Sequence, residues 1–478
     1  MSPSFQKLSA CLGVVVCATT SLVAESMPEG VLKQLDVAPV WSVHQTGRPI
    51  LMTRDDRQYV LYYDHDRFMT IAARELGGDV WQHFRFPAKM GWQTGSHANL
   101  SLGIDRDGYL HVTCYRRGMI VGPRTPPRAI YYRSEAPHSI EAFERLPMVP
   151  KNVNPNYPTF YAVGDDLFFR FRRGGSGRGD WLLNRYDPEQ REWRQVLAHP
   201  LIDGERRRGA YPEGPIPGPD GRFHVQWVWR ETSDHASNHS ISYARTVGND
   251  LTQWESAAGE PVSTPFTIAD RQLLIDPAEP GEGLSNVLRG MSWDSQDRAV
   301  ISYHRFDENE YSQIYNARFQ DGEWLIVPAT QWTFIWGRDY VGSGALNIRD
   351  HVRMSRVRIG QEGELMQDVW NRDDGGSVVV LDEETLLPLR QESPQPPPEW
   401  RRQLSRPESD FIVPPIPRLR RAGGPMHVDW IADRGDSQSN GVQYYLRWEH
   451  AGSNRDGAIP EPWPEPSMLR LYKVQSED

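Results

Sequence analysis

The sequence has few cysteines, and their positions argue against a disulfide framework. Only 3 of the 478 residues are cysteine. Cys11 and Cys17 lie in the first 24 residues, so Cys114 is left alone if that segment is removed. A lone cysteine cannot form a disulfide within the chain, even in an oxidising compartment. We therefore expect the hydrophobic core to stabilise the fold, which a chain of this length can supply.

Long apolar runs are also scarce, and the one that exists lies at the N-terminus. Lys7 supplies a positive start, residues 12–22 are mostly apolar, and Leu22-Val23-Ala24 resembles a cleavage site. This pattern predicts a signal peptide over residues 1–24, followed by a single domain over residues 25–478. We therefore expect a secreted or periplasmic protein without a membrane span.

The chain lacks a basic excess. It has 53 Lys and Arg against 63 Asp and Glu, which gives a formal net charge of −10. Nucleic acids bind to broad basic surfaces, so this balance argues against a nucleic acid partner. An anionic substrate would have to meet a local cluster of basic side chains. We expect the protein to act as a monomer.

No convincing amphipathic helix follows the leader, and the composition favours an all-β fold. The chain has 17 Trp, 19 Tyr and 40 Gly. Short runs alternate between apolar and polar residues, and each follows a turn signal such as Asp107-Gly108 or Asp220-Gly221. The runs are residues 59–63, 109–115, 166–172, 222–229 and 299–303.

The repetition of these runs predicts a seven-bladed β-propeller. Several units end with a tryptophan after a charged loop, as at Trp81, Trp193, Trp254 and Trp324. A turn followed by two strands and a tryptophan is typical of a propeller blade. A repeat of roughly 65 residues gives about seven blades over the length of the chain. Two β-sandwiches joined by the proline-rich residues 394–398 are the alternative.

The repeat separates structural from functional histidines. His111 and His224 occupy the same position in two units, each followed by valine, which indicates a structural role. His97 has no such counterpart. It precedes the second unit, where a connection would reach the rim of the central channel. His97 is therefore the better functional candidate, with a surface loop as the alternative.

Arginine and phenylalanine alternate in residues 166–172. Successive side chains of a strand point to opposite faces, so Arg170 and Arg172 should share one face and Phe169 and Phe171 the other. A glycine-rich turn follows. Two guanidinium groups on one face could bind a carboxylate or sulfate bidentately. A solvated edge face is the alternative.

Tyr157 lies just upstream, at the expected start of the same blade. With Arg172 and His97 it would supply a proton carrier, a charge neutraliser and a second base. We expect these three side chains to converge at one end of the channel.

Four ordered segments resemble the BNR-repeat propeller proteins that include ulvan lyases and rhamnose-glucuronate lyases. The resemblance is clearest from about residue 90 to 340. It implies a lyase that cleaves a uronic-acid-containing, ulvan-like polysaccharide by β-elimination, with no cofactor required for catalysis. The segments are residues 156–158, 169–177, 218–232 and 238–245.

The resemblance also assigns roles. Tyr157 matches the family's catalytic tyrosine, Arg172 its neutralising arginine and His97 its first histidine. Arg117 stands where the family has a second histidine, and arginine cannot act as a base near neutral pH. Arg117 takes over charge neutralisation, or the active site differs, or the family reaction is lost.

Further residues are candidates for substrate binding. These are Arg117, Arg170, Asn99, Trp229, Arg230 and His239. Trp227 and Trp229 share a strand face and could stack on sugars, although core packing is the more common role of such a pair. A structural metal is conceivable, but His235 and His239, four residues apart outside a helix, are a weak signal for one.

Two other functions remain open at this stage. A glycoside hydrolase of the sialidase or rhamnosidase kind would need paired carboxylates, or a nucleophile with an arginine triad, and no distinct acid pair is present. A non-catalytic glycan-binding propeller would use the tryptophans and the arginine face while His97 and Tyr157 did no chemistry.

Overall fold

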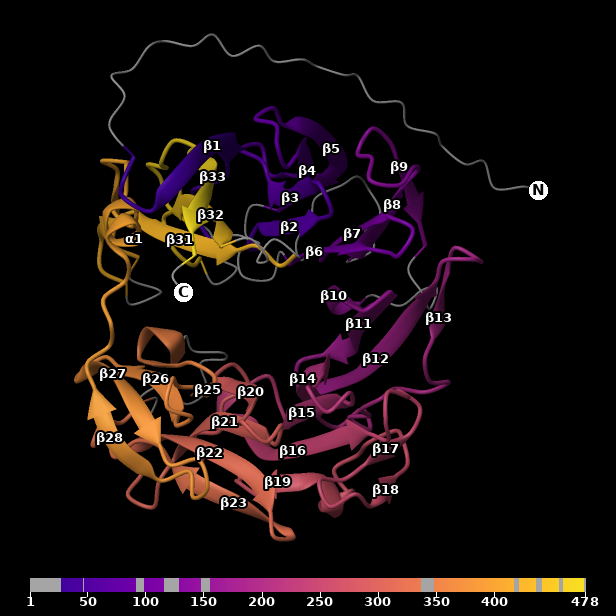
Figure 1. The fold of residues 1–478 in the computed structure, drawn as a ribbon, viewed down its shortest axis with the longest axis vertical. Helices are drawn as coiled ribbons and strands as arrows, with labels where there is room; N and C mark the ends of the chain where they lie inside the picture. The colour runs from indigo at the N-terminus through magenta and orange to yellow at the C-terminus, as the bar shows by residue number, and fades with distance from the viewer. Residues whose placement is uncertain are drawn as a thin grey trace. The chain divides into compact units, whose positions relative to one another are not determined.

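The structure, a computed structural model, consists mainly of antiparallel β-strands (Figure 1). In the described part of the chain, α1 (Glu399–Leu404) is the one α-helix. The all-β class predicted from composition is confirmed. The structure describes residues 27–45, 47–91, 99–115, 129–147, 155–336, 348–416, 421–435, 441–454 and 459–476.

The chain divides into two compact units. Unit 1 comprises Met1–Phe171, Asn184–Arg194 and Pro397–Asp478, and unit 2 comprises Arg172–Leu183 and Gln195–Pro396. The division falls within β11 (Asp166–Gly175) and β12 (Arg178–Asp187).

Unit 1 contains three four-stranded antiparallel sheets. It also contains the β10–β11 pairing and the short β29–β30 pairing. The sheets are β2 (Ile50–Arg54), β3 (Arg57–Tyr63), β4 (Phe68–Glu75) and β5 (Gln82–Lys89); β6 (Leu100–Ile104), β7 (Leu110–Tyr115), β8 (Ala129–Ser134) and β9 (Phe143–Leu146); and β1 (Val31–Val40), β33 (Ser467–Gln475), β32 (Val442–His450) and β31 (His427–Ala432). The other strands are β10 (Asn156–Val163), β13 (Glu192–Gln195), β29 (Ile412–Val413) and β30 (Gly424–Pro425).

Unit 2 is built from similar sheets. The first continues from β12 through β14 (Gly209–Pro217), β15 (Phe223–Arg230), β16 (Asn238–Thr246), β17 (Trp254–Glu255) and β18 (Pro261–Val262), with β19 (Leu274–Asp276) beside β16. The second is β20 (Arg289–Trp293), β21 (Ala299–Phe306), β22 (Ser312–Gln320) and β23 (Glu323–Pro328). The third is β24 (Val352–Met354), β25 (Arg358–Ile359), β26 (Leu365–Asn371), β27 (Gly375–Leu381) and β28 (Pro388–Glu392).

The alternating runs of the sequence occupy equivalent strands. Each run predicted from alternation overlaps β3, β7, β11, β15 or β21, and in the four-stranded sheets this is the second strand in sheet order. β3, β15 and β21 are largely buried, and all eight residues of β15 are inaccessible or nearly so. The repeat detected in the sequence is therefore a repeat of core strands.

A recurring aspartate turn joins strands in both units. In four hairpins, one Asp Oδ1 accepts hydrogen bonds from the backbone N–H groups two and four residues later, at 2.9–3.0 Å. The residue three positions after the Asp has φ between 62° and 85°. This side chain fixes the turn locally, as in other Asx turns. The four aspartates are Asp64, Asp105, Asp294 and Asp307.

His111 and His224 have matching structural environments. Both are buried, with exposed fractions of 0% and 1%. Each ring bonds through Nδ1 to a tyrosine of the next strand and through Nε2 to an aspartate of the preceding turn, and burial lowers the pKa of both. The predicted structural role of this pair agrees with these contacts. The bonds are His111 to Tyr131 (2.8 Å) and Asp105 (3.1 Å), and His224 to Tyr243 (2.6 Å) and Asp220 (2.9 Å).

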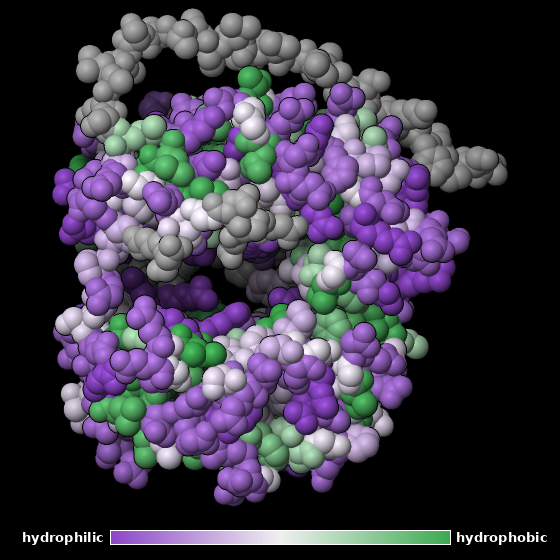
Figure 2. Space-filling model, in the orientation of Figure 1, coloured by the Kyte–Doolittle hydropathy of each residue, from purple (hydrophilic) through white to green (hydrophobic). Residues whose placement is uncertain are grey.

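The surface seen in Figure 2 is mostly hydrophilic, with apolar side chains in scattered patches. Within the described residues, no helix has the length and apolar character needed to cross a membrane.

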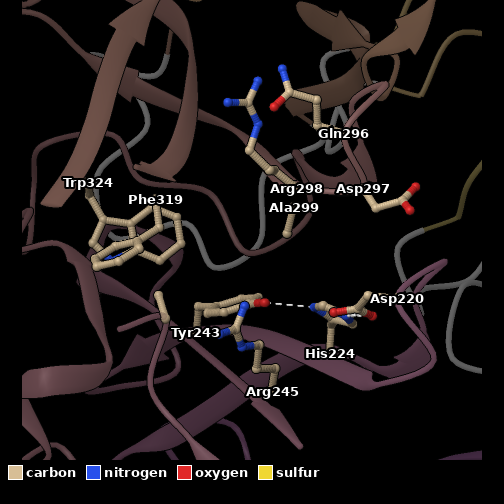
Figure 3. A pocket seen from close by; sticks show the side chains of 11 residues that line it. Asp220, His224, Tyr243, Arg245, Gln296, Asp297, Arg298, Ala299, Phe319 and Trp324 are labelled. Carbon is tan, nitrogen blue, oxygen red and sulfur yellow. Dashed lines mark hydrogen bonds and ion pairs between the residues drawn. The ribbon is translucent and has the colours of Figure 1, made fainter. Parts of the chain in front are cut away.

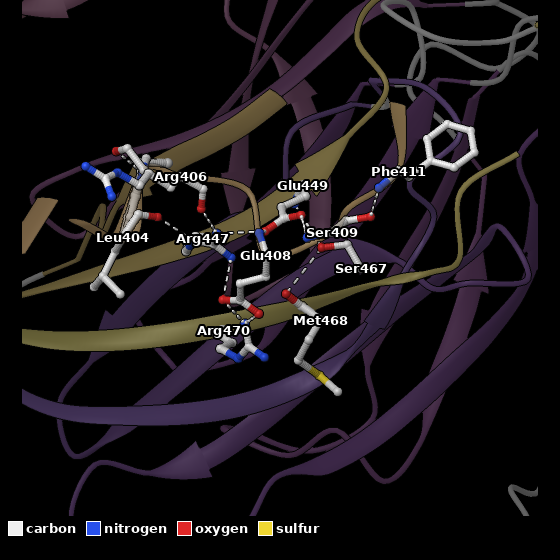
Figure 4. Close-up of polar contacts among 12 residues, drawn as sticks. Leu404, Arg406, Glu408, Ser409, Phe411, Arg447, Glu449, Ser467, Met468 and Arg470 are labelled. Carbon is white, nitrogen blue, oxygen red and sulfur yellow. Dashed lines mark hydrogen bonds and ion pairs between the residues drawn. The ribbon is translucent and has the colours of Figure 1, made fainter. Parts of the chain in front are cut away.

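The N-terminal and C-terminal strands share one sheet. β1 pairs with β33 from Val31–Val474 to Val40–Ser467. In this sheet, Arg447 of β32 is almost wholly buried and donates to the carbonyls of Leu404 and Arg406, at 2.7 and 2.8 Å, and to Glu449 at 2.7 Å (Figure 4). This one guanidinium therefore ties the segment after α1 to β32.

Glu449 completes the network from the other side. Its carboxylate accepts from the backbone N–H groups of Glu408 and Ser409, at 2.8 and 3.2 Å. Glu408 in turn binds Arg470, which also donates to Asp36 of β1 at 2.9 Å. The charged side chains thus connect three segments that are distant in sequence.

Replacing Arg447 tests how much this network stabilises the fold. Arg447→Leu leaves Glu449 and two carbonyls without their buried donor, so we expect the free energy of unfolding to fall by about 3–5 kcal/mol. Arg470→Leu is the matched control. Arg470 is more accessible, with 18% of its side chain exposed, and we expect a loss of about 1 kcal/mol. Equal losses in urea denaturation would contradict the special role of Arg447.

Candidate functional site

Tyr157 adopts an unusual backbone conformation. It is the second residue of β10, is half-buried and has φ 53°. A bulky residue other than glycine rarely occupies this left-handed region, and such strain is concentrated at functional sites. The carbonyl of Tyr157 accepts a hydrogen bond from the Thr159 hydroxyl at 3.2 Å. The functional role of this tyrosine stays a prediction.

The two arginines of β11 alternate with its phenylalanines. Phe169 and Phe171 are each 1% exposed, and their rings stack at 5.1 Å. Arg170 is half-buried and lies over the ring of Tyr161 at 5.7 Å in unit 1. Arg172 is only 5% exposed. It is not the solvated edge residue of the alternative interpretation.

The ring of Tyr211 in β14 contacts two buried arginines of unit 2, Arg172 and Arg230. The Arg172 guanidinium carbon lies 5.3 Å from the centroid of its ring, and that of Arg230 lies 5.5 Å from it. The Tyr211 hydroxyl is 2.7 Å from Ser176 Oγ, and the carbonyl of Tyr211 accepts from Arg289 at 2.7 Å. A buried tyrosine ring thus orders two guanidinium groups by cation–π contacts. We call Arg172, Tyr211 and Arg230 the arginine–tyrosine cluster.

The glycine-rich turn makes room for this cluster. A Cβ on Gly179 would lie 2.7 Å from Arg172 Cδ, so a larger residue would displace the arginine. Gly177 has φ 71°, and a Cβ there would lie 2.6 Å from the backbone of Thr232. The glycines after β11 therefore permit close approach and a left-handed turn.

Arg230 keeps its charge in a buried position. It is 4% exposed. Its guanidinium donates to the carbonyls of Asp234, at 3.0 Å, and of Ser233, and its Nη1 is 3.5 Å from the Tyr211 hydroxyl. These partners are all neutral. A buried cation that is held by neutral groups is well suited to attract an anionic ligand.

An ion-pair network borders the cluster. Glu231 accepts from Arg208 Nε at 2.8 Å and lies 2.8 Å from His239 Nε2. Partial burial raises the pKa of the Glu231 carboxyl, but the hydrogen bonds with Arg208 and His239 outweigh this effect and lower it. Glu231 is therefore ionised near neutral pH and fixes the ring of His239.

The other predicted residues lie in different surroundings. Asn99 directly precedes β6 in unit 1 and is half-buried. Trp229 is 1% exposed and contacts Trp227 edge-on at 6.2 Å. It therefore packs in the core, and its ring is not accessible for stacking on a sugar. His97 and Arg117 lie outside the described residues. Tyr157 belongs to unit 1 and Arg172 to unit 2, so their convergence stays a prediction.

Two more buried histidines lie in unit 2. His235 and His304 both contact the ring of Trp336, at 5.7 and 5.6 Å. Burial lowers the pKa of each to about 4, and Arg230 contributes further at His235. No group of three His, Cys, Asp or Glu side chains suited to a metal ion occurs in the described part of the chain. His239, the other histidine considered for a metal, is bonded to Glu231 instead.

These two histidines predict a loss of stability in acid. Their folded pKa of about 4 lies below the unfolded value, so the unfolded chain binds more protons between pH 6.5 and 4. Stability is then fully present above pH 6.5 and falls as the pH decreases, by about 3 kcal/mol for each histidine. We expect denaturant titrations at several pH values to show this slope.

His304→Gln should reduce that pH dependence, because glutamine keeps a donor for the Gly283 carbonyl but does not titrate. His65→Gln, at a position with 46% side-chain exposure, is the control and should leave the slope unchanged. An unchanged slope in His304→Gln would show that its titration does not affect folding.

Sequence reasoning missed Tyr211, although a signal for it was present. Tyr211-Pro212 near the start of β14 repeats the Tyr157-Pro158 pair near the start of β10. The basic residues 206–208 were considered as a possible basic rim or a solvated loop. The structure has two of them exposed, while Arg208 binds Glu231.

Comparisons with known proteins agree on one fold. A sequence profile described as a BNR repeat-containing family member matches residues 57–332, more than half of the chain. The chain is 24% identical over 213 residues to a protein of Alteromonas sp. named ulvan lyase, long isoform. That alignment covers 40% of this chain and only 20% of the relative.

Two solved structures are similar along nearly the whole chain. The polysaccharide lyase Uly1 has a TM-score of 0.57 at 13% identity, over 94% of this chain and 100% of that one. A polysaccharide lyase of family PL25, an ulvan lyase bound to -[GlcA(1-4)Rha3S]-, has a TM-score of 0.54 at 14% identity, over 94% and 96%. At such low identity the likeness establishes a shared fold.

Proposed function

The chain belongs to the BNR repeat-containing family, and on this basis we propose that it is a polysaccharide lyase. Its proposed substrate is an ulvan-like polysaccharide that contains uronic acid. The partial relative is named an ulvan lyase, and one protein with the shared fold holds a glucuronate-rhamnose sulfate ligand. Both names support this class of substrate for the present chain.

The observation that carries this proposal is the arginine–tyrosine cluster. Arg172 and Arg230 are buried cations within 5.5 Å of one tyrosine ring. A uronate carboxylate makes the adjacent C5–H bond acidic only when its negative charge is neutralised. Fixed guanidinium groups do this most effectively where little water competes. The cluster is thus the part of unit 2 best suited to bind a uronate.

The reaction needs a base, an acid and a cation. The base removes the proton from C5, the electrons of that bond form the C4–C5 double bond, and O4 leaves with a proton from the acid. We assign the proton transfers to Tyr157 and His97 and carboxylate neutralisation to Arg172. Arg117, Arg170, Asn99, Arg230 and His239 are assigned to substrate binding.

Two further properties belong to the proposal. The repeated four-stranded sheets and the shared fold support seven blades around one axis. A polymer of this kind is too large to enter a cell intact, so we place the activity outside the cytoplasm, as the expected leader would require.

The reaction has a direct spectroscopic test. β-Elimination creates an unsaturated uronate whose conjugated double bond absorbs short-wavelength ultraviolet light, whereas hydrolysis creates no such chromophore. We expect purified protein to produce this absorbance from ulvan. Tyr157→Phe removes only a hydroxyl and should lower turnover by about 10² or more, while binding of the polymer stays near wild type.

Three other results would each contradict part of this proposal. Full activity in Tyr157→Phe would remove the tyrosine from proton transfer. Reducing ends without the unsaturated chromophore would indicate a hydrolase. Binding without either product would indicate a glycan-binding protein.

A second prediction concerns the neutralising charge. Arg172→Ala should reduce both polymer binding and turnover, since a carboxylate contact exists in the bound substrate and in the transition state. Arg173→Ala is the matched control, because the neighbouring side chain is 46% exposed and pairs with Asp180. We expect it to retain activity. Equal loss in both variants would show that Arg172 has no specific role.

A further inference from the structure

A pocket lies at the other end of β15 from the arginine–tyrosine cluster. His224 is the second residue of this strand and Arg230 the last. At about 3.3 Å per residue they are roughly 20 Å apart along the strand. The pocket, of about 380 Å³, is lined by residues of the β14–β17 and β20–β23 sheets. It is therefore distinct from the proposed catalytic cluster.

One side of the pocket is aromatic. Figure 3 shows Trp324 and Phe319 together on that side, and their rings meet edge-on at 5.6 Å. Both side chains are half-buried, so part of each ring faces the open space. The buried Tyr243 supports Trp324 from below at 5.6 Å. Such a surface fits the apolar face of a sugar ring.

The other sides carry polar and charged groups, and the two arginines among them are paired with carboxylates. Arg245 donates to Glu255 at 2.8 Å, and Arg298 donates to Asp294 at 2.8 Å. Asp220 accepts from the ring of His224. Gln296 and Asp297 are exposed at the rim (Figure 3). With both arginines paired and the carboxylates of Asp220 and Asp297 also in the lining, the pocket offers hydrogen bonds without attracting an anion.

The geometry points to a second carbohydrate site, and we propose that this pocket binds one neutral sugar residue of the polysaccharide. The sugar packs against Trp324 and Phe319. Its hydroxyls bond to Asp297, to Arg298 and to the amide oxygen of Gln296, whose amide nitrogen donates to Glu384 at 2.9 Å. The volume suits one ring with some water. This inference rests on the proposed function only in taking a polysaccharide as the ligand.

A second contact on the same chain has a predictable effect. Once one part of a polymer is bound, the other part binds as if at high local concentration. Loss of the pocket should therefore weaken binding of long polymer while short oligosaccharides react as before. The measured signature is a higher KM for polymer with kcat unchanged.

The test uses methyl α-L-rhamnoside as a neutral probe and D-glucuronate as an anionic one. In saturation-transfer NMR we expect the neutral probe to bind wild type and to bind Trp324→Leu at least about tenfold more weakly, the scale of one lost aromatic contact with its water exclusion. Trp430→Leu, a half-buried tryptophan of unit 1, is the matched control and should bind the probe normally.

A second variant guards against misfolding of Trp324→Leu. Ala257→Phe fills the pocket from a turn and removes no polar contact. It should abolish probe binding while the melting temperature stays near wild type. Added salt should leave binding of the neutral probe unchanged, because no net charge is involved.

The possible results separate this inference from the proposed function. Absence of probe binding, equal binding by wild type and Ala257→Phe, or displacement of the probe by equimolar glucuronate would each overturn the pocket proposal. Probe binding that depends on Trp324 in a protein without lyase activity would keep the pocket and remove the lyase assignment.

Discussion

Pairing of buried charges fixes the connections between distant segments of this molecule. Arg318 is inaccessible and bonds to Asp294, Gln320 and the carbonyl of Glu384. Arg447 and Glu449 form such a pair in β32, where the end of α1 and the segment after it meet the sheet of β1 and β33. Removing one partner of such a pair leaves an uncompensated charge, which is costlier than the bond itself is stabilising. These pairs therefore make the connections between distant segments specific.

In the candidate site, the buried arginine Arg230 has hydrogen-bond partners of a different kind from those of Arg318 and Arg447. Arg230 is as buried as the framework arginines, yet its bonds go to carbonyls and a phenol. None of these three partners is a carboxylate. Two other features fix positions at a cost in conformational freedom. Tyr157 has a backbone φ that is unfavourable for a non-glycine residue, and Arg172 packs so closely on Gly179 that no larger residue fits there. Framework and site can thus be told apart by what their polar groups bind.

The two ends of β15 serve different chemistry in this view. At one end, Arg230 faces Tyr211 with its charge retained. At the other, burial lowers the pKa of His224, whose ring bonds to Asp220 and Tyr243 beside the aromatic pocket. One strand thereby connects a cationic cluster to an aromatic pocket roughly 20 Å away.

The sequence by itself determined the fold class, the core strands and the structural histidines, because strand alternation and Asp-Gly turns act over a few residues. His111 and His224 could be recognised as framework from their repeated position alone. Tertiary structure decided that Trp229 packs in the core, that Arg208 and His239 share Glu231, and that Tyr211 organises Arg172 and Arg230. Local pattern shows which face of a strand a side chain takes, but not which strand lies opposite. Burial and pairing depend on that opposite strand, and only the folded chain supplies it.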